Sequence, residues 1–445
     1  MLVVEAPRSR EPERTYALDL VLGHLLGLEH SPRFTERTDW CIRVAGSDEE
    51  LVLPDALLGI PDEEWLTPAS LPQSITPGGP PLVFSGTTSA GTLCDPFATV
   101  FFLLTRYEER ALRLADALGR FPAGCSLVVR AGLGDRPLAD ECAEWLWEQL
   151  VERWPRLERR RGELTVALTH DVDWVSTVRQ PLPRVVRLVG GDALRRRDPL
   201  LAARRARAAL RVRLGRRDVR DPADTFELLM RTSEEVGLRS AFFFIAPTPG
   251  AAPFHNEGYD LARPDVRRLL REIHDRGHEL GLHGAFSTHT SAASLRTQLA
   301  TLVAAARAEG VEQEAWGGRQ HFLQFEAPTT WACWEEAGLA YDSSLAFAEA
   351  PGFRCGTTRP FPVFDLDARR QLRLVEQPLI AMEGSFLDPQ YLGLPPDEAA
   401  ARMLELARMC KRYGGRFTLL WHNTALVRAA DRSLYRDLVR SLASL

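Results

Sequence analysis

Residues 164–173, LTVALTHDVD, form a strand-like run that ends directly on an imidazole and two carboxylates. Three later runs of similar character also end on residues that bind metals or move protons. Their endings are His283, the tripeptide Arg319-Gln320-His321, and the pair His422-Asn423. In a barrel of parallel strands, the side chains that do chemistry sit where the strands end, at the carboxyl face. Four such endings within residues 164–423 predict parallel strands that share one pocket.

The length and composition indicate a globular protein of two domains. The chain has 445 residues, of which 45% are hydrophobic and 26% charged, and its formal net charge is −5. This length exceeds one ordinary core, and the composition is typical of a folded chain. The net charge gives no reason to expect nucleic acid as a partner. We place the boundary at the charged segment 156–161, which separates an N-terminal α/β domain, residues 1–160, from a second domain, residues 161–445.

The second domain alternates between strand-like and helical patterns. The expected strands are 164–169, 240–246, 279–283, 315–318, 339–343, 372–379 and 416–421, and the expected helices are 223–236, 264–276, 291–309, 327–337 and 397–413. Seven strands that mostly alternate with helices predict an α/β fold with a parallel barrel, slightly short of the usual eight strands. In the first domain we expect strands at 40–44, 82–85 and 126–129 and helices at 96–107, 111–118 and 139–154.

An arginine-rich insertion at about 185–221 interrupts this alternation. Its centre, residues 195–213, predicts a basic helix. We interpret it as a solvated cover over the barrel mouth, so that Arg204, Arg205 and Arg207 contribute charge rather than stability. One alternative is an electropositive rim for an anionic sugar or nucleotide-linked substrate. Another is contact with a membrane surface, although the apolar face looks narrow for that.

The cysteines and the apolar runs bear on the location of the protein. The seven cysteines are scattered and form no CxxC pair, so neither a thiolate zinc site nor a disulfide framework is indicated. No window approaches about 18 uninterrupted apolar residues, and we expect no transmembrane helix. The first residues lack the basic and apolar regions of a secretory signal. Free thiols in a reducing compartment are the simplest interpretation, and we expect a cytoplasmic protein.

Asp171 and Asp173 flank Val172 at the end of the first strand. Because side chains two apart on a strand point the same way, both carboxylates face one cavity. Two carboxylates there can divide labour, one binding a divalent metal and the other acting as general base. An Asp-rich turn that caps the next segment is the alternative interpretation.

The segment HELGLH, residues 278–283, differs from the metalloprotease helix HExxH. Its histidines are five residues apart rather than four, and Gly277 and Gly281 argue against a helix. On a strand, an odd separation sends two side chains to opposite faces. One histidine therefore reaches the pocket, and His283, at the end of the strand, is the better candidate.

A second imidazole for a metal must come from another segment. His289 lies six residues beyond His283 in a predicted loop, from which it could fold back. His321 ends a different strand, two residues after Arg319, which places both side chains on the same side. His422 closes the last strand of the series.

These segments resemble the polysaccharide deacetylase family, carbohydrate esterase family 4 with the NodB homology domain. LTHDVD at 168–173 resembles the first motif of that family. The later motifs are represented by GHELGLH at 277–283, GRQHFL at 318–323 and LLWHN at 419–423. YDSS at 341–344, GFRCG at 352–356 and PFP at 360–362 resemble a bacterial branch that carries an additional N-terminal domain. The resemblance covers residues 164–445 well and the N-terminal part more loosely.

The resemblance implies a deformed (β/α)7 barrel of the NodB homology type, preceded here by a smaller α/β domain. It also implies metal-dependent removal of N-acetyl or O-acetyl groups from a sugar or surface polysaccharide. The roles that it implies are general base for Asp171, metal ligand for Asp173 and His283, orientation of Asp171 for Arg319, and general acid for His422.

Two positions depart from the family pattern. Val172 separates two aspartates that are usually adjacent, and Ser287 occupies the place of the second motif's other histidine. We expect His321 to supply the missing ligand rather than His289, because a strand end fixes an imidazole better than a loop does.

The expected cofactor is a divalent metal, Zn²⁺ before Co²⁺, Ni²⁺ or Mn²⁺, and the expected partner is a carbohydrate, with an anionic one as an option. The candidate substrate contacts are His170, Trp174, Trp421 and Asn423. Two alternative functions stay open at this point. One is a catalytically inactive glycan-binding protein, and the other is a hydrolase of a non-peptide, non-sugar C–N bond on the same fold.

Overall fold

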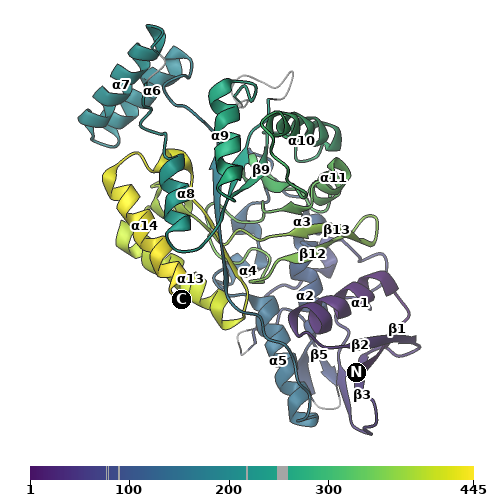
Figure 1. The fold of residues 1–445 in the computed structure, drawn as a ribbon. Coiled ribbons are helices and arrows are strands. Elements are labelled where there is room, and N and C mark those ends of the chain that lie inside the picture. The colour runs from purple at the N-terminus through teal and green to yellow at the C-terminus, as the bar shows by residue number, and fades with distance from the viewer. Residues whose placement is uncertain (77, 79, 89–90, 217–218, 248–258) are drawn as a thin grey trace.

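The computed structural model describes residues 1–76, 78, 80–88, 91–216, 219–247 and 259–445. Its largest element is a curled sheet of nine strands in the order β12-β13-β11-β10-β9-β8-β7-β15-β14 (Figure 1). The strands are β7 (Thr165–Val172), β8 (Ser240–Phe244), β9 (Glu279–Gly284), β10 (Gly317–Gln320), β11 (Tyr341–Asp342), β12 (Phe361–Asp365), β13 (Arg370–Glu376), β14 (Ala381–Met382) and β15 (Arg416–Leu420). Neighbours pair in parallel except β12 and β13, which are antiparallel.

Helices follow most of these strands and cover the sheet. They are α8 (Phe226–Glu234), α9 (Pro264–Asp275), α10 (Ala292–Arg307), α11 (Thr329–Ala337), α12 (Glu383–Leu387), α13 (Pro396–Arg412) and α14 (Ala429–Ala443). In α9 the apolar residues Val266, Leu270 and Ile273 recur at helical spacing, and all three are fully buried. Figure 1 shows these helices around the curled sheet, with α9, α10 and α11 toward the top and upper right of the view and α8, α13 and α14 toward the left.

The predicted parallel α/β arrangement is confirmed, with a different strand count. Each of the seven predicted strand segments contains a strand, and β12 and β14 are additional. Within the described residues, β12 and β14 lie at opposite edges of the sheet with no pairing between them. The sheet is thus an open, curled half-barrel in this part of the chain rather than a closed ring of seven.

The N-terminal part has its own mixed sheet, in the order β2-β1-β3-β4. Its strands are β1 (Leu2–Pro7), β2 (His30–Thr35), β3 (Trp40–Val44) and β4 (Glu50–Leu53), and a separate hairpin consists of β5 (Ser85–Thr88) and β6 (Gly91–Cys94). Its helices are α1 (Glu11–Leu18), continued by a π-helical segment Asp19–Leu25, α2 (Pro96–Leu104), α3 (Tyr107–Leu112), α4 (Leu127–Arg130) and α5 (Leu138–Arg153).

The strand predicted at 126–129 is wrong, because this segment is helix α4. A short apolar run does not distinguish a strand from a buried helical turn. A distant side chain stabilises the start of α4, since the Leu127 backbone N–H donates to the Glu108 carboxylate at 2.8 Å.

The N-terminal part and the large sheet share one hydrophobic core. Ion pairs and hydrogen bonds cross between them. Glu109 pairs with Arg106 at 2.9 Å and with Arg354 at 2.8 Å, and all three side chains are buried. Tyr16 donates its hydroxyl hydrogen to the Pro362 carbonyl at 2.7 Å, which ties α1 to the edge strand β12.

The arginine-rich insertion forms a helical hairpin of α6 (Leu182–Leu194) and α7 (Pro199–Arg213), which extends away from the rest of the molecule (Figure 1). Asp198 caps α7 by accepting the Leu201 N–H at 2.8 Å. The expectation that Arg205 contributes only charge is wrong. Its side chain is 2% exposed and pairs at 2.6 Å with Asp192, which is also buried, so it fastens the two helices together.

No helix among the described residues is long and apolar enough to cross a membrane. All seven cysteines are free thiols.

Candidate metal centre

The carboxyl ends of β7, β9, β10 and β15 bring the four sequence motifs together. Arg319 on β10 lies opposite His283 on β9 in the strand register. The two strands approach closely because residue 318 is glycine, where a Cβ atom would lie 1.8 Å from the Leu282 carbonyl oxygen. A larger residue at that position would push β10 away from β9 and displace both functional side chains.

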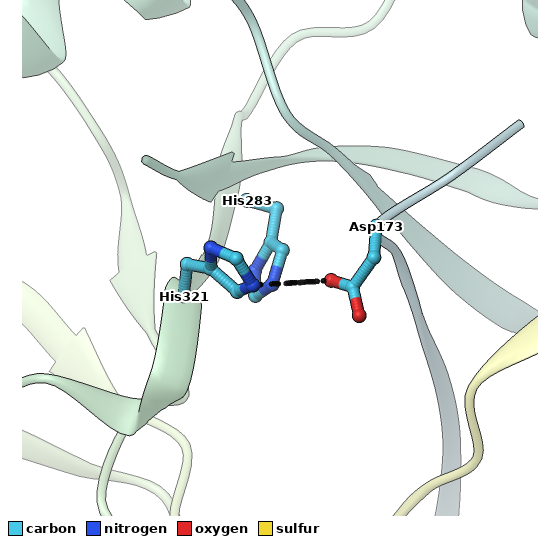
Figure 2. Close-up of side chains that lie close together, drawn as sticks. All are labelled: Asp173, His283 and His321. Atoms are coloured by element: carbon cyan, nitrogen blue, oxygen red, sulfur yellow. Dashed lines mark ion pairs between the residues drawn. The ribbon is translucent and has the colours of Figure 1, made fainter. Parts of the chain in front are cut away.

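Asp173, His283 and His321 form a compact group of possible metal ligands (Figure 2). Oδ1 of Asp173 lies 3.4 Å from Nε2 of His283 and 3.5 Å from Nε2 of His321. The three ligand atoms all lie within 4.8 Å of one another. Within the described ranges of the chain, no other group of three His, Cys, Asp or Glu residues meets this criterion.

The donors fit a divalent metal in number, type and spacing. Zinc binds imidazole nitrogen and carboxylate oxygen at about 2.0–2.2 Å, so tetrahedral ligands lie about 3.4 Å apart. The two measured separations agree with that value. Oδ1 of Asp173 is buried and accepts no hydrogen bond, an arrangement that costs free energy unless a cation occupies the space beside it.

A hydrogen bond from the His283 ring to the backbone determines which ring nitrogen is free to bind a metal. Nδ1 lies 2.8 Å from the backbone carbonyl oxygen of Arg319. Because a carbonyl only accepts, Nδ1 carries the proton, and in the neutral ring Nε2 presents its lone pair to the space beside Asp173. Ligating histidines are commonly held in this way by a backbone carbonyl.

Asp171 is held beside this group by Arg319. Nη1 of Arg319 donates to Oδ1 of Asp171 at 2.8 Å, and its Nε and Nη2 donate to the carbonyl and hydroxyl oxygens of Ser343 at 2.8 and 2.9 Å. Both side chains are buried, with Arg319 0% and Asp171 2% exposed. The other carboxylate oxygen of Asp171 lies 3.7 Å from Nε2 of His283. The guanidinium is thus immobilised and fixes one orientation of the carboxylate.

His422 lies beside the other carboxylate oxygen of Asp173 and is held by a residue that the sequence analysis missed. Its Nε2 lies 4.0 Å from Oδ2 of Asp173, and its Nδ1–H donates to Oε1 of Glu383 at 2.7 Å. Glu383 follows β14, where the apolar run 379–382 ends on a carboxylate. This is the same pattern as in the four motifs, so the sequence did contain a signal for Glu383.

The charges of the site set the protonation states of its acids and bases. Burial alone would raise the pKa of Asp171, but Arg319 and His283 together hold it below its usual value. Burial opposes ionisation of Asp173 as well, and the neighbouring imidazoles still keep its pKa well below normal. Both carboxylates are therefore ionised at neutral pH.

Two of the three imidazoles beside Asp173, those of His321 and His422, differ in basicity. Burial lowers the pKa of His321 to about 4 despite the nearby Asp173, so this ring is neutral, as a metal ligand must be. Burial also opposes the charged form of His422, but the Glu383 carboxylate outweighs it and raises the pKa of His422 to about 10. His422 is therefore protonated at neutral pH.

His289 is not a member of the ligand group. It is 9% exposed, and its ring lies near Gly119 of the N-terminal part. Ser287, at the place of the family's other histidine, donates its backbone N–H to Gln324 at 2.7 Å. The imidazole that stands with Asp173 and His283 is that of His321.

Three of the four expected substrate contacts lie in the interior, which differs from the expectation. His170 donates from Nδ1 to the Trp421 carbonyl at 2.8 Å, and its Nε2 lies 3.2 Å from the Ser240 hydroxyl oxygen, so both nitrogens have partners within the protein. Trp421 is 1% exposed and packs edge-on against Tyr435.

Asn423 is also buried, and it links two loops at the site. Its side-chain N–H donates to the Trp174 carbonyl at 3.0 Å, which ties the segment after β7 to the end of β15. Trp174 itself is partly exposed, and the guanidinium of Arg184 lies 5.5 Å from its ring centroid. Trp174 is thus the expected contact whose side chain reaches the surface.

Comparisons with known proteins gave one family model and similar solved structures. The model of a family of unknown function, DUF7033, matches residues 2–155. The search of the curated proteins found no match. Among solved structures, the chain is similar to a protein from Mycobacterium smegmatis assigned as a polysaccharide deacetylase, with 20% identity, a TM-score of 0.39, and coverage of 64% of this chain and 86% of that one.

A second similar structure is that of a protein from Pseudomonas aeruginosa PAO1, also assigned as a polysaccharide deacetylase. The identity is 12%, the TM-score is 0.36, and the match covers 62% of this chain and 83% of the other. At these low identities and TM-scores, the function proposed below rests on the geometry of the site.

Proposed function

We propose that the protein is a metal-dependent deacetylase that hydrolyses N-acetyl or O-acetyl groups of a sugar or polysaccharide. The observation that carries this proposal is the position of Asp173, His283 and His321 between an ionised carboxylate, Asp171, and a protonated imidazole, His422. A hydrolase of amides or esters needs a site that polarises a carbonyl, a base for water and an acid for the leaving group. The site offers all three within a few ångströms.

Asp173, His283 and His321 would hold the metal, with Zn²⁺ favoured by the mixed nitrogen and oxygen ligands. A bound ion of this kind lowers the pKa of water to about 7 and polarises the acetyl carbonyl. Three protein ligands would leave room for water or substrate on the ion, as in catalytic rather than structural zinc sites.

The other residues carry the proton transfers. Asp171 accepts the proton of the attacking water, and Arg319 keeps the carboxylate ionised and correctly oriented. His422 donates its proton to the departing amine or alcohol, and Glu383 keeps the ring charged and aimed at the pocket. Base and acid thus start the reaction in opposite protonation states, as hydrolysis requires. The division of the chain into two domains at residue 160 belongs to this proposal as well.

The test uses the purified full-length chain. Metal content is measured by elemental analysis, and release of acetate is measured on N-acetylated and O-acetylated sugars before EDTA, after EDTA and after Zn²⁺ is restored. We expect acetate release that EDTA abolishes and Zn²⁺ restores. Asp173→Asn serves as the matched control, because it removes one ligand charge and should lose both metal and activity.

Two results would favour the alternatives. Glycan binding without acetate release by the metal-loaded protein would indicate a catalytically inactive binding protein. Hydrolysis of a non-sugar amide in preference to every acetylated sugar would retain the chemistry and change the substrate class.

A further inference from the structure

The positive charge of the chain is concentrated in the α6–α7 hairpin. Residues 182–216 contain 11 arginines and two aspartates and no other charged residue, which gives a net charge of +9. Since the whole chain carries −5, the remainder carries −14. One projecting element is therefore strongly cationic on an otherwise acidic protein.

The same element carries most of the exposed apolar side chains. Nine large hydrophobic residues are exposed in the described part of the chain, and six of them lie in or directly after this hairpin. These six are Leu182, Val186, Leu194, Leu200, Leu210 and Leu214, which are 58–80% exposed. Soluble surfaces rarely gather apolar residues in this way unless they contact a partner or a membrane.

Leucines and arginines share one face of α7. Leu200, Arg204, Arg207, Arg211 and Leu214 are spaced by four, three, four and three residues. This spacing aligns them along one side of a helix. The face therefore presents three cationic side chains with a leucine at each end, and the long apolar stems of the arginines extend the apolar surface between them.

This face of α7 borders a cavity of about 990 Å³ between α7, α8 and the start of α14. Seven arginines and three acidic residues line it. Arg204 and Arg207 from α7 and Arg436 from α14 form no hydrogen bond or ion pair with the residues that the structure describes. Unpaired guanidiniums that converge on a cavity favour phosphate, which arginine binds in a bidentate manner.

We propose that the α6–α7 hairpin docks the protein on a membrane that contains anionic phospholipids. The exposed leucines enter the boundary between headgroups and acyl chains, and the arginines of α7 and the cavity bind lipid phosphates. Interfacial helices combine a cationic face with exposed leucines in this way, and each basic residue adds to the attraction. The buried Arg205–Asp192 pair holds the two helices as one rigid unit, so both helices meet the surface together.

The charge distribution argues against the other occupants of this surface. A second copy that docked through the same hairpin would place +9 against +9. A soluble polyanion would neutralise the arginines and leave the six exposed apolar side chains in water. The rest of the chain has a net charge of −14 and is repelled by an anionic surface. The hairpin therefore approaches the membrane first. This inference goes beyond the proposed function, and its test requires no enzyme activity.

The experiment is co-sedimentation of the full-length protein with vesicles of phosphatidylcholine alone and of phosphatidylcholine mixed with phosphatidylglycerol. We expect binding to the mixed vesicles that weakens as salt is added. The variant Arg204→Gln/Arg207→Gln/Arg211→Gln should reduce the partition coefficient roughly 100-fold. The variant Leu200→Ser/Leu210→Ser/Leu214→Ser should reduce it at least about tenfold, because these side chains no longer gain from leaving water.

The matched control is Arg296→Gln/Arg370→Gln/Arg373→Gln, which makes the same change in net charge at exposed positions of α10 and β13. It should bind vesicles like the unmodified protein. Equal loss of binding in this control would overturn the proposal, because net charge alone would explain the result.

Two further outcomes also contradict the proposal. One is absence of vesicle binding together with a dimer that the leucine variant dissociates, which would assign the surface to a second copy. The other is binding of inorganic polyphosphate that the arginine variant loses, without any binding to mixed vesicles. That result would show a soluble anion site rather than a membrane contact.

Discussion

Glu383 accepts two hydrogen bonds from His422, one from the ring Nδ1–H at 2.7 Å and one from the backbone N–H at 3.2 Å. A single carboxylate oxygen thus fixes both the backbone and the ring of the proposed general acid. The carboxylate also raises the pKa of His422 to about 10.

Replacing Glu383 by Gln should shift the pH dependence of turnover. Glutamine keeps the shape of the side chain but removes its charge, so the pKa of His422 falls toward its ordinary value of about 6.5. The ring then loses its proton at a lower pH, and the basic limb of the kcat profile moves down by more than one pH unit. The measurement is kcat against pH, with metal content as the control. An unmoved basic limb would show that another group protonates the leaving group.

Asp171→Asn should leave the fold and the metal content near those of the unmodified protein and lower kcat by about 10²- to 10⁴-fold. The amide still fits beside Arg319, which bonds Oδ1 of Asp171 at 2.8 Å, but it cannot take a proton from water. Acetate release measures kcat, and elemental analysis of the same preparation measures the metal content. Turnover that survives the substitution would remove Asp171 from the role of base.

His321→Ala and His289→Ala should differ in metal content. His321 stands with Asp173 and His283, and its removal leaves two ligands. His289 lies outside that group, so its variant should keep the metal. Both variants are measured by elemental analysis after dialysis. Loss of metal in the His289 variant alone would reverse the assignment, and retention in both would show that water or substrate fills the third position.

His170 should make the folded protein less stable as the pH falls. Burial lowers the pKa of His170 to about 4, although its bond to the Trp421 carbonyl opposes the shift, whereas the unfolded chain has the ordinary value of about 6.5. The contribution of His170 to the free energy of unfolding is therefore fully present above about pH 6.5. It falls by about 3 kcal/mol as the pH is lowered toward 4. His170→Asn retains a donor for that carbonyl and does not titrate.

The difference between the two proteins isolates this effect. Urea unfolding of the unmodified protein and of His170→Asn is compared at several pH values between 4 and 7. We expect the gap between their free energies of unfolding to narrow or reverse as the pH falls. A constant gap would show that His170 titrates equally in the folded and unfolded states.

The sequence predicted the parts of the site that depend on local pattern. Asp171, His283, Arg319 and His422 each end an apolar run, and a parallel sheet brings such endings to one edge. The preference for His321 over His289 rested on the same geometric reasoning, and the structure places His321 in the ligand group.

Contacts between distant residues account for what the sequence did not predict. Glu383 directly follows a strand of only two residues, β14, which is paired with β15. The interior positions of His170 and Trp421 depend on partners such as Ser240 and Tyr435, which lie far away in the chain. Alternation along a strand assigns two faces, but it does not state which face meets the pocket.

The ion pairs of Glu109 have a consequence for how the chain is made. Arg106 is three residues away, but Arg354, the other partner of this buried carboxylate, lies 245 residues later in the chain. A ribosome releases the N-terminal part long before it makes Arg354, so the nascent chain must leave this charge group incompletely paired. Folding of the N-terminal part therefore reaches its final packing only after most of the large sheet has been synthesised. We expect the finished protein to lose both parts in one cooperative transition on heating.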